Sequence, residues 1–424
     1  MSIEVHRARR TYYAQHTTLL NVPTARFERL LAHPAMPIVV GAKYLGFEEL
    51  AASPLEHCVT AADETRPEDV GVSAADLDGL LRQQASGQIR PEDVLAEIQR
   101  LRTQHANTRN ARTPDQLREA LVARSGVGVA AWEKAAQEVL ESLLPYDIGR
   151  PHALSQDAER QEQMNQARSM GLGEVLILDD FPMILAAYGY TRTEDGPRAP
   201  GRAGVLSRLN PFPADRDHGA RSPIFVDQVN ADALVLRLNA DLVLDWLARN
   251  GIAFQRPPGT DEAMATKAFF VELFSDANLR LTIDATNAAQ RMVFGLLHTV
   301  SHMGVRQAAL LSGLERTSLS EYLLPSTLTA VIYCNHRFGA TIGALTSLFE
   351  QSLGDWLTAI RGAYRCVYDP VCDDAGANCH ACTHLAETSC RFFNLNLSRS
   401  FLFGGPDAIL GRIRAGYFQM TRPV

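Results

Sequence analysis

The sequence CVYDPVCDDAGANCHACTHLAETSC, residues 366–390, contains five of the seven cysteines of the chain. Random scattering would place about 0.4 cysteines in a window of this length, so the clustering indicates a shared chemical role. Thiolates bind zinc, and a tetrahedral zinc site closes with four thiolates or with three thiolates and an imidazole. The stretch therefore predicts a zinc-binding segment that has too few apolar residues to fold without the metal.

The spacing of these cysteines suggests which of them bind the ion. Cys379 and Cys382 form a CxxC turn, Cys372 lies seven residues before it and Cys390 eight residues after it. The predicted ligands are Cys372, Cys379, Cys382 and Cys390, with Cys366, His380 and His384 as alternatives. A disulfide is disfavoured because nothing marks the chain as secreted, and a redox CxxC would need neither outer cysteine. Four thiolates leave no position for water, so the predicted metal is structural.

The composition is that of an ordinary globular protein. The chain has 424 residues, of which 46% are hydrophobic and 21% charged, and this length predicts two or three domains. The N-terminus is charged and no apolar run has the length of a membrane span, so we expect a cytoplasmic protein with reduced thiols. The net charge of −7 argues against a protein that coats nucleic acid by charge alone.

The pattern of apolar residues predicts a mixed α/β or α+β fold. Residues 1–65 are expected to be rich in strands, with candidates at Thr18–Val22 and Pro37–Val40, and residues 66–170 to form a helical insertion whose first helix Ser73 caps. Residues 171–190 predict a strand, at 173–178, followed by a helix, and the Arg-, Pro- and Gly-rich residues 191–223 predict a linker or loop.

Residues 224–424 are predicted to form the C-terminal domain, with the zinc-binding subdomain at 366–390. Its expected strands are 233–238 and 328–334, and its expected helices are 240–250, 284–311 and 344–363. The expected architecture is a mixed sheet with a helical insertion and a C-terminal four-cysteine zinc subdomain.

Two histidines on the longest predicted helix form a second candidate site. His298 and His302 are four residues apart and share a helix face, as metal-binding pairs do. Thr299 stands where metalloproteases carry their general base, which argues against protease chemistry. Buried, hydrogen-bonded histidines are the preferred interpretation over a second metal site. The nearest acidic residues after the pair are Glu315 and Glu321, which we expect to be solvated or paired with Arg306 or Arg316.

The sequence contains no P-loop for ATP hydrolysis. A P-loop needs a lysine after its glycines, and none of the three lysines, Lys43, Lys134 and Lys267, has that context. The chain also lacks a GxSxG nucleophile motif and a compact Asp/Glu/Lys set typical of nucleases. The C-terminal region is rich in arginine, and the candidate DNA contacts are Arg391, Arg399, Arg412 and Arg414.

Several motifs resemble one protein family. They are Arg365-Cys366, Asp369-Pro370-Val371-Cys372, Cys379-His380-Ala381-Cys382 and Glu387-Thr388-Ser389-Cys390, followed by Asn394, with Leu297–His302, Leu319–Tyr322 and Val331–Tyr333 upstream in the same order. These motifs resemble the DrmB subunit family of the DISARM anti-phage system, whose C-terminal zinc domain also occurs in MrfA-type helicases. The resemblance extends over about residues 230 to 405.

The sequence departs from this family in two ways. Longer members carry a further cysteine cluster upstream, so the resemblance implies a shortened or split variant whose missing part is another chain. The family's glycine pair after the last strand is Gly343-Ala344 here, which leaves the role of that loop open.

The resemblance implies a non-catalytic accessory or scaffold subunit. Its expected partners are a helicase or ATPase subunit of the same defence system and DNA, and its expected cofactor is Zn²⁺. Two alternatives remain open: a zinc-dependent hydrolase or nuclease that uses His298 and His302, and a DNA-binding protein that acts alone.

Overall fold

The computed structural model describes residues 12–21, 31–46, 71–109, 114–147, 158–193, 207–214, 219–256, 261–275, 287–335, 343–386 and 389–420. The helices are α2 (Met36–Leu45), α5 (Ala74–Ala85), α6 (Val94–Arg109), α7 (Pro114–Ser125), α8 (Val129–Asp147), α9 (Ala158–Ser169), α10 (Ala240–Arg249), α11 (Glu262–Ser275), α12 (Ala288–Ser312), α13 (Ala344–Gln351), α14 (Leu353–Gly362), α15 (Val371–Asp374) and α16 (Ser400–Phe403). Among these helices, none combines the length and apolarity that a membrane span requires.

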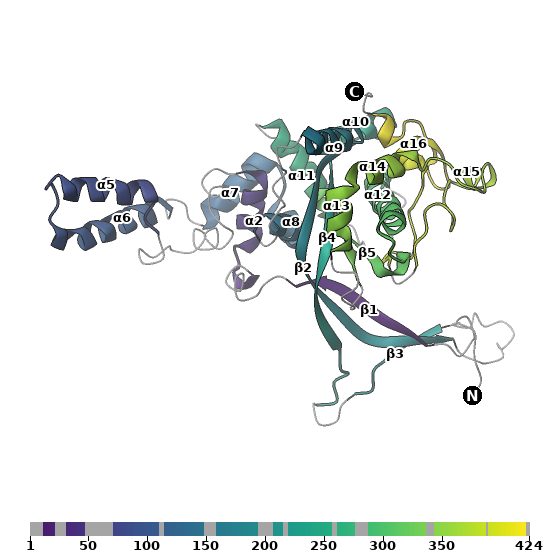
Figure 1. The fold of residues 1–424 in the computed structure, drawn as a ribbon, viewed down its shortest axis with the longest axis horizontal. Coiled ribbons are helices and arrows are strands. Elements are labelled where there is room, and N and C mark those ends of the chain that lie inside the picture. The colour runs from purple at the N-terminus through teal and green to yellow at the C-terminus, as the bar shows by residue number, and fades with distance from the viewer. Residues whose placement is uncertain are drawn as a thin grey trace.

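The main sheet is antiparallel and is formed by strands that are far apart in the sequence. Its strands are β1 (Tyr12–Leu20), β2 (Leu172–Thr193), β3 (Ser207–Pro211), β4 (Phe225–Leu238), β5 (Leu319–Leu324) and β6 (Thr329–Cys334). The order is β1-β2-β4-β6-β5, and β3 also pairs with β2. β6 pairs with the second half of β4, whereas β1 and β3 pair with the second half of β2, which projects away from the helices (Figure 1). A second, two-stranded sheet pairs β7 (Gly405–Asp407) with β8 (Gly411–Ile413).

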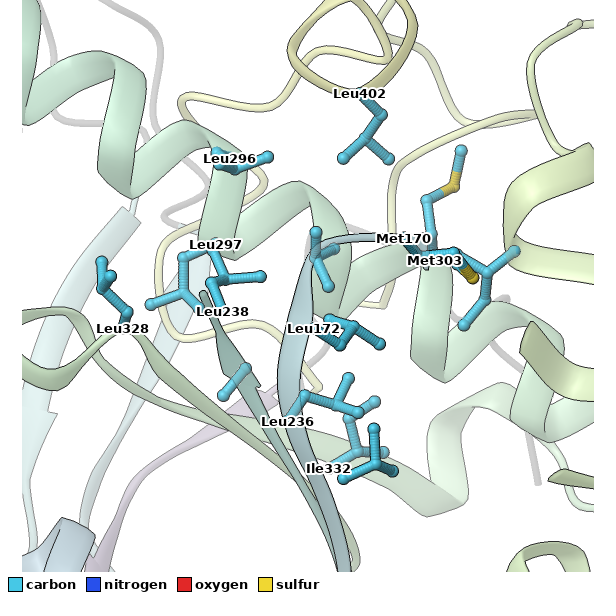
Figure 2. Packing of buried hydrophobic residues seen from close by; sticks show 14 of the residues in the cluster. Met170, Leu172, Leu236, Leu238, Leu296, Leu297, Met303, Leu328, Ile332 and Leu402 are labelled. Atoms are coloured by element: carbon cyan, nitrogen blue, oxygen red, sulfur yellow. The ribbon is translucent and has the colours of Figure 1, made fainter. Parts of the chain in front are cut away.

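Both faces of the sheet are buried where β4 and β6 meet. Neighbouring side chains of a strand point to opposite faces, and Leu234 and Leu236 accordingly belong to one apolar cluster while Ala233 and Val235 belong to another. Helices α9, α10, α12, α13 and α14 contribute to the first cluster, and α2, α7 and α8 contribute to the second. Figure 2 shows Leu297 of α12 beside Leu238 of β4, with Met303 of α12 in the same first cluster. This double burial explains why the central strands are almost continuously apolar.

Helix α12 lies at the centre of the first cluster, and both of its ends carry sequence signals. The side chain of Asn287 accepts a hydrogen bond from the N–H of Gln290 at 3.0 Å, which caps the N-terminus. Gly313 ends the helix with a φ of 72°, a left-handed conformation that glycine adopts without strain. Because nearly every residue from 289 to 305 is buried, polar side chains on this helix must find partners inside the protein.

The mixed fold with a C-terminal cysteine cluster is confirmed, and the predicted helices in residues 66–168 form. Ser73 caps α5 as expected, accepting a hydrogen bond from the N–H of Asp76 at 3.1 Å. Figure 1 shows α5 and α6 side by side, apart from the sheet. The long helix, the strands at 233–238 and 328–334, and helix 240–250 are present, while the helix expected at 344–363 is divided into α13 and α14.

Two predictions of local structure are wrong. Pro37–Val40 was predicted as a strand but lies in α2, where Ile38, Val39 and Val40 are buried. A four-residue apolar run fits either a strand or a buried helix, and here packing against α8 decides. The helix predicted after residue 178 is also absent, because β2 continues as a strand to Thr193 through an irregularity between Leu178 and Phe181. Residues 191–223, predicted as a linker or loop, include the end of β2 and all of β3.

Candidate metal centre

The segment after α14 folds back on itself and brings distant cysteines together. α15 carries Cys372, and the CxxC turn is closed by the N–H of Cys382, which donates to the carbonyl of Cys379 at 3.1 Å. Between them, Gly376 has a φ of 100°, and a Cβ at this position would lie 3.0 Å from the Cβ of Ala408. Glycine is therefore needed where the loop reverses direction.

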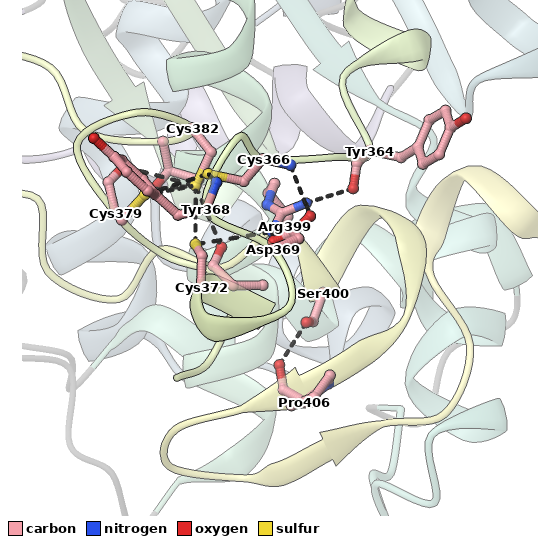
Figure 3. Close-up of polar contacts among 12 residues, drawn as sticks. Tyr364, Cys366, Tyr368, Asp369, Cys372, Cys379, Cys382, Arg399, Ser400 and Pro406 are labelled. Atoms are coloured by element: carbon pink, nitrogen blue, oxygen red, sulfur yellow. Dashed lines mark hydrogen bonds and ion pairs between the residues drawn. The ribbon is translucent and has the colours of Figure 1, made fainter. Parts of the chain in front are cut away.

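The sulfur atoms of Cys366, Cys372, Cys379 and Cys382 converge on one point (Figure 3). The Sγ–Sγ distances are 3.5 Å between Cys366 and Cys379, 3.6 Å between Cys372 and Cys382, and 3.7 Å between Cys379 and Cys382. A disulfide requires about 2.05 Å. Four thiolates around zinc at about 2.3 Å define a tetrahedron with edges of about 3.8 Å. The observed distances are close to these edges and far longer than a disulfide, so the four cysteines are positioned for metal binding.

The four-cysteine cluster provides a complete ligand shell. Four thiolates satisfy a tetrahedral ion and leave no position for water or substrate, so a metal bound here would be structural. Sulfur ligands select zinc over magnesium or calcium, which prefer oxygen. The chain between Cys366 and Cys382 contains only one short helix, so the ion would replace the apolar core that this loop lacks.

Arg399 connects the cysteine loop to the segment that precedes α16. Its guanidinium donates to both carboxylate oxygens of Asp369, at 2.7 and 3.2 Å, and to the carbonyl of Tyr364 (Figure 3). Asp369 in turn accepts a hydrogen bond from the N–H of Cys366 at 2.7 Å, and Nη2 of Arg399 lies 3.8 Å from Sγ of Cys372. This arrangement orients two of the four cysteines and places a positive charge beside their sulfurs.

Arg306 of α12 holds the CxxC turn from the other side. Its guanidinium donates to the carbonyls of Ala381 and of His384, the latter at 2.9 Å, with the carbonyl of His380 at 3.4 Å. Burial lowers the pKa of this guanidinium, while the nearby cysteines Cys382, Cys379 and Cys366 act in the opposite direction. Because α12 is anchored in the main core, Arg306 fixes the turn relative to the sheet.

Burial and hydrogen bonding act differently on the thiols of the cluster. Burial raises the pKa of Cys366 and of Cys372. Burial also disfavours the Cys379 thiolate, but the N–H of Ala381 and the neighbouring thiols outweigh it and lower the pKa of Cys379 to about 7. Of these three cysteines, Cys379 is therefore the one whose thiolate form is favoured.

The structure brings together three of the four predicted metal ligands, and the fourth member of the cluster is one of the residues that the sequence offered as an alternative ligand. Cys372, Cys379 and Cys382 lie in the cluster, and the fourth sulfur is that of Cys366. Cys390 lies in a different group, because the loop after Cys382 leads back to α12 and β5 instead of closing on the CxxC turn. His380 is exposed and His384 is half-buried; their ring centroids are 4.7 Å apart, and neither belongs to the four-sulfur cluster.

The second group consists of His298, His302, Glu321 and Cys390. Oε1 of Glu321 lies 3.0 Å from Nε2 of His298 and 3.1 Å from Nε2 of His302, and Sγ of Cys390 lies 3.3 Å from Nε2 of His298. All four side chains are buried. Sequence analysis identified the histidine pair but expected Glu321 to be solvated or paired with an arginine. Its position on β5 beside α12 is a tertiary contact that sequence spacing does not reveal.

The ionisable side chains of this second group shift one another's pKa. Burial disfavours the Glu321 carboxylate, but His302 and His298 outweigh it and lower its pKa, so the carboxylate is ionised at neutral pH. Burial lowers the pKa of His298, against the attraction of Glu321, and favours its neutral form. Burial and the Glu321 charge raise the pKa of the Cys390 thiol.

The arginines proposed to contact DNA occupy different environments. Arg399 is only 2% exposed and is engaged by Asp369, so its guanidinium is not presented to solvent. Arg391 is exposed and lies over the ring of Tyr322, with its guanidinium carbon 5.7 Å from the ring centroid. Arg412 and Arg414 are exposed on β8 and directly after it. Three of the four candidates are thus accessible to a phosphate.

The chain is similar to a known protein over part of its length. No protein-family model matches the chain. The chain is similar to the DISARM protein DrmB of Bacillus paralicheniformis, with 25% identity over 198 residues, which is 41% of this chain and 32% of that protein. The match thus covers about a third of the relative's length. It supports a DrmB-like relationship, on a chain that also carries a four-cysteine cluster positioned for metal binding.

Proposed function

We propose that this chain is a non-catalytic accessory subunit of a DISARM-type anti-phage defence complex, stabilised by a structural zinc ion at Cys366, Cys372, Cys379 and Cys382. The observation that carries the proposal is the similarity to DrmB, a protein of the DISARM system. The four-sulfur geometry supports a closed structural metal site and gives the metal no catalytic position.

In this proposal the chain acts in the cytoplasm as a scaffold. A separate helicase or ATPase subunit supplies ATP turnover, since the sequence contains no P-loop. The alternative of a zinc hydrolase built on His298 and His302 is disfavoured, because both histidines are fully buried and offer no approach to a substrate.

Co-expression of the chain with its neighbouring genes tests the assignment to a defence complex. A helicase subunit encoded beside it is expected to co-purify, and deletion of the gene for this chain is expected to abolish protection against phage. The measurements are affinity purification followed by mass spectrometry, and plaque counts on hosts with and without the gene. A chain that purifies alone from cells whose phage resistance does not depend on it would contradict the proposal.

DNA contact is proposed to involve the exposed arginines of the C-terminal region. Replacing Arg391, Arg412 and Arg414 with alanine is expected to weaken binding to duplex DNA, because each substitution removes a positive charge that would neutralise a phosphate. Each lost phosphate contact is also expected to reduce the magnitude of the slope of log K against log salt by about 0.9. The measurement is fluorescence anisotropy of labelled duplex DNA between low and physiological salt, with the purified complex.

A matched variant controls for net charge. Arg82, Arg90 and Arg118 are exposed arginines in the helical insertion, and replacing them with alanine removes the same three charges far from the C-terminal region in sequence. This control is expected to bind DNA with the slope of the unaltered protein. Equal affinities and equal slopes for the two triple variants would exclude the C-terminal arginines as the DNA contact.

A further inference from the structure

The second group of side chains lies in the interior, where polar atoms need partners. His298 and His302 come from α12, Glu321 from β5 and Cys390 from the loop beyond the cysteine cluster, and their exposed fractions are between 0% and 2%. An ionised carboxylate at such a site is costly unless a positive charge or several hydrogen-bond donors compensate it. The hydrogen bonds of His302 show that its side chain, in the neutral form, does not donate a hydrogen bond to the Glu321 carboxylate.

The tautomer of His302 follows from its backbone contact. Nδ1 lies 2.7 Å from the carbonyl oxygen of Thr383, and a carbonyl can only accept, so Nδ1 carries the proton. In the neutral ring Nε2 then bears a lone pair, which faces Oε1 of Glu321 at 3.1 Å. Two lone pairs in contact repel each other unless a cation lies between them or a proton is added to the ring or to the carboxyl group. Among the described residues, Oε2 of Glu321 also has no hydrogen-bond partner.

The sulfur of Cys390 is held like a metal-bound thiolate. The backbone N–H groups of Phe392 and Asn394 both point at Sγ, with nitrogen–sulfur distances of 3.4 Å. The turn that aims them requires positive φ values at Phe393 and Asn394, of 53° and 55°, which non-glycine residues adopt rarely. The side-chain amide of Asn394 bonds both the N–H and the carbonyl of Leu385, which fixes this turn.

We infer that His298, His302, Glu321 and Cys390 form a second, closed metal site that binds a borderline divalent cation, of which Zn²⁺ is the best fit. Zinc bonds of about 2.0 to 2.1 Å to nitrogen and oxygen give a tetrahedron with edges of about 3.3 to 3.4 Å. The two nitrogen–oxygen separations, 3.0 and 3.1 Å, are close to this size, and the nitrogen–sulfur separation of 3.3 Å compares with about 3.5 Å expected for a zinc–sulfur bond of about 2.3 Å. One carboxylate and one thiolate neutralise the ion, which suits a buried site.

The donor set explains the otherwise unfavourable contacts. The ion would lie between the lone pair of His302 and the carboxylate, and the Nδ1–H of His302 would keep its carbonyl partner, as metal-bound histidines do. Because Thr383 follows Cys382 directly in the chain, this hydrogen bond connects the second site to the four-cysteine cluster. The two ions would together fasten the cysteine loop to α12 and β5.

Metal analysis of the whole chain, purified without chelator, tests this inference. We expect two zinc ions per chain by mass spectrometry of the released metal. X-ray absorption at the zinc edge should show sulfur at about 2.3 Å together with nitrogen or oxygen at about 2.0 Å. One ion per chain with a shell made only of sulfur would overturn the inference. This measurement needs no variant and does not depend on the proposed role in defence.

Variants assign the ions to the two sites. Glu321→Gln, which keeps the size of the side chain, is expected to lower the content from two ions to one and to leave an all-sulfur shell. Glu141→Gln is the matched control, because Glu141 is also buried, accepts a hydrogen bond from Tyr322 and lies outside both groups, so it should retain two ions. A Glu321→Gln protein that still holds two ions would exclude Glu321 as a ligand.

Discussion

Replacing Cys382 with alanine is expected to remove the metal from the four-cysteine cluster and to unfold the loop around it. Cys382 is buried, and its sulfur lies within 3.7 Å of two other sulfurs of the cluster. The binding free energy of structural zinc sites is on the order of 10 kcal/mol, and a loop with one short helix has little else to keep it folded. Zinc content and the rate of limited trypsin digestion measure the effect.

Cys334→Ala serves as the control for this substitution. Cys334 is also buried, but it lies on β6 in the main apolar core and belongs to neither metal group. Its substitution is expected to leave the zinc content and the digestion pattern unchanged. If Cys382→Ala retained its full metal content and the digestion pattern of the unaltered chain, the four cysteines would not form a metal site.

Loss of the buried ion pair between Arg291 and Asp407 is expected to be the second large effect. The guanidinium of Arg291, on α12, donates to both carboxylate oxygens of Asp407, at 2.9 and 3.0 Å, and both side chains are buried. Arg291 also contacts the side chain of Asn396. Arg291→Ala would leave a carboxylate buried without its cation, which typically lowers the free energy of unfolding by about 3 to 5 kcal/mol.

Urea unfolding in excess zinc measures this difference. Arg118→Ala is the matched control, because Arg118 pairs with Asp115 at 2.7 Å but both side chains are exposed to water. Exposed pairs contribute no more than about 1 kcal/mol, so the control should be nearly as stable as the unaltered chain. A loss for Arg291→Ala no greater than that of the control would mean that the buried pair contributes little to stability.

Local signals in the sequence were reliable where one residue type has one physical role. Ser73 caps a helix because its hydroxyl satisfies a free backbone N–H, and Gly313 ends α12 because it accepts a left-handed conformation. Both effects act within a few residues, so neither depends on the rest of the fold. The helical spacing of apolar residues before Gly313 likewise predicts α12, because this spacing is also a property of neighbouring residues in the chain.

Short apolar runs were not decided locally. Pro37–Val40 and the residues after Phe181 could each form a helix or a strand, because a few apolar residues fit a buried helix face and a buried strand equally well. Packing against α8 makes the first a helix, and pairing with β1 and β4 makes the second part of a long strand. These packing partners are distant in the chain, so the local sequence pattern cannot predict them.

The sequence by itself determined where the cysteine-rich segment lies and predicted that it binds a metal, since five cysteines in 25 residues indicate a common chemical cause. It also determined that His298 and His302 share one helix face. Only the tertiary structure decided that Cys366 joins the first cluster and that Cys390 meets Glu321 and the two histidines. Ligand spacing limits which side chains can reach a point, but the path of the loop, held by Arg306 and Arg399, selects among them.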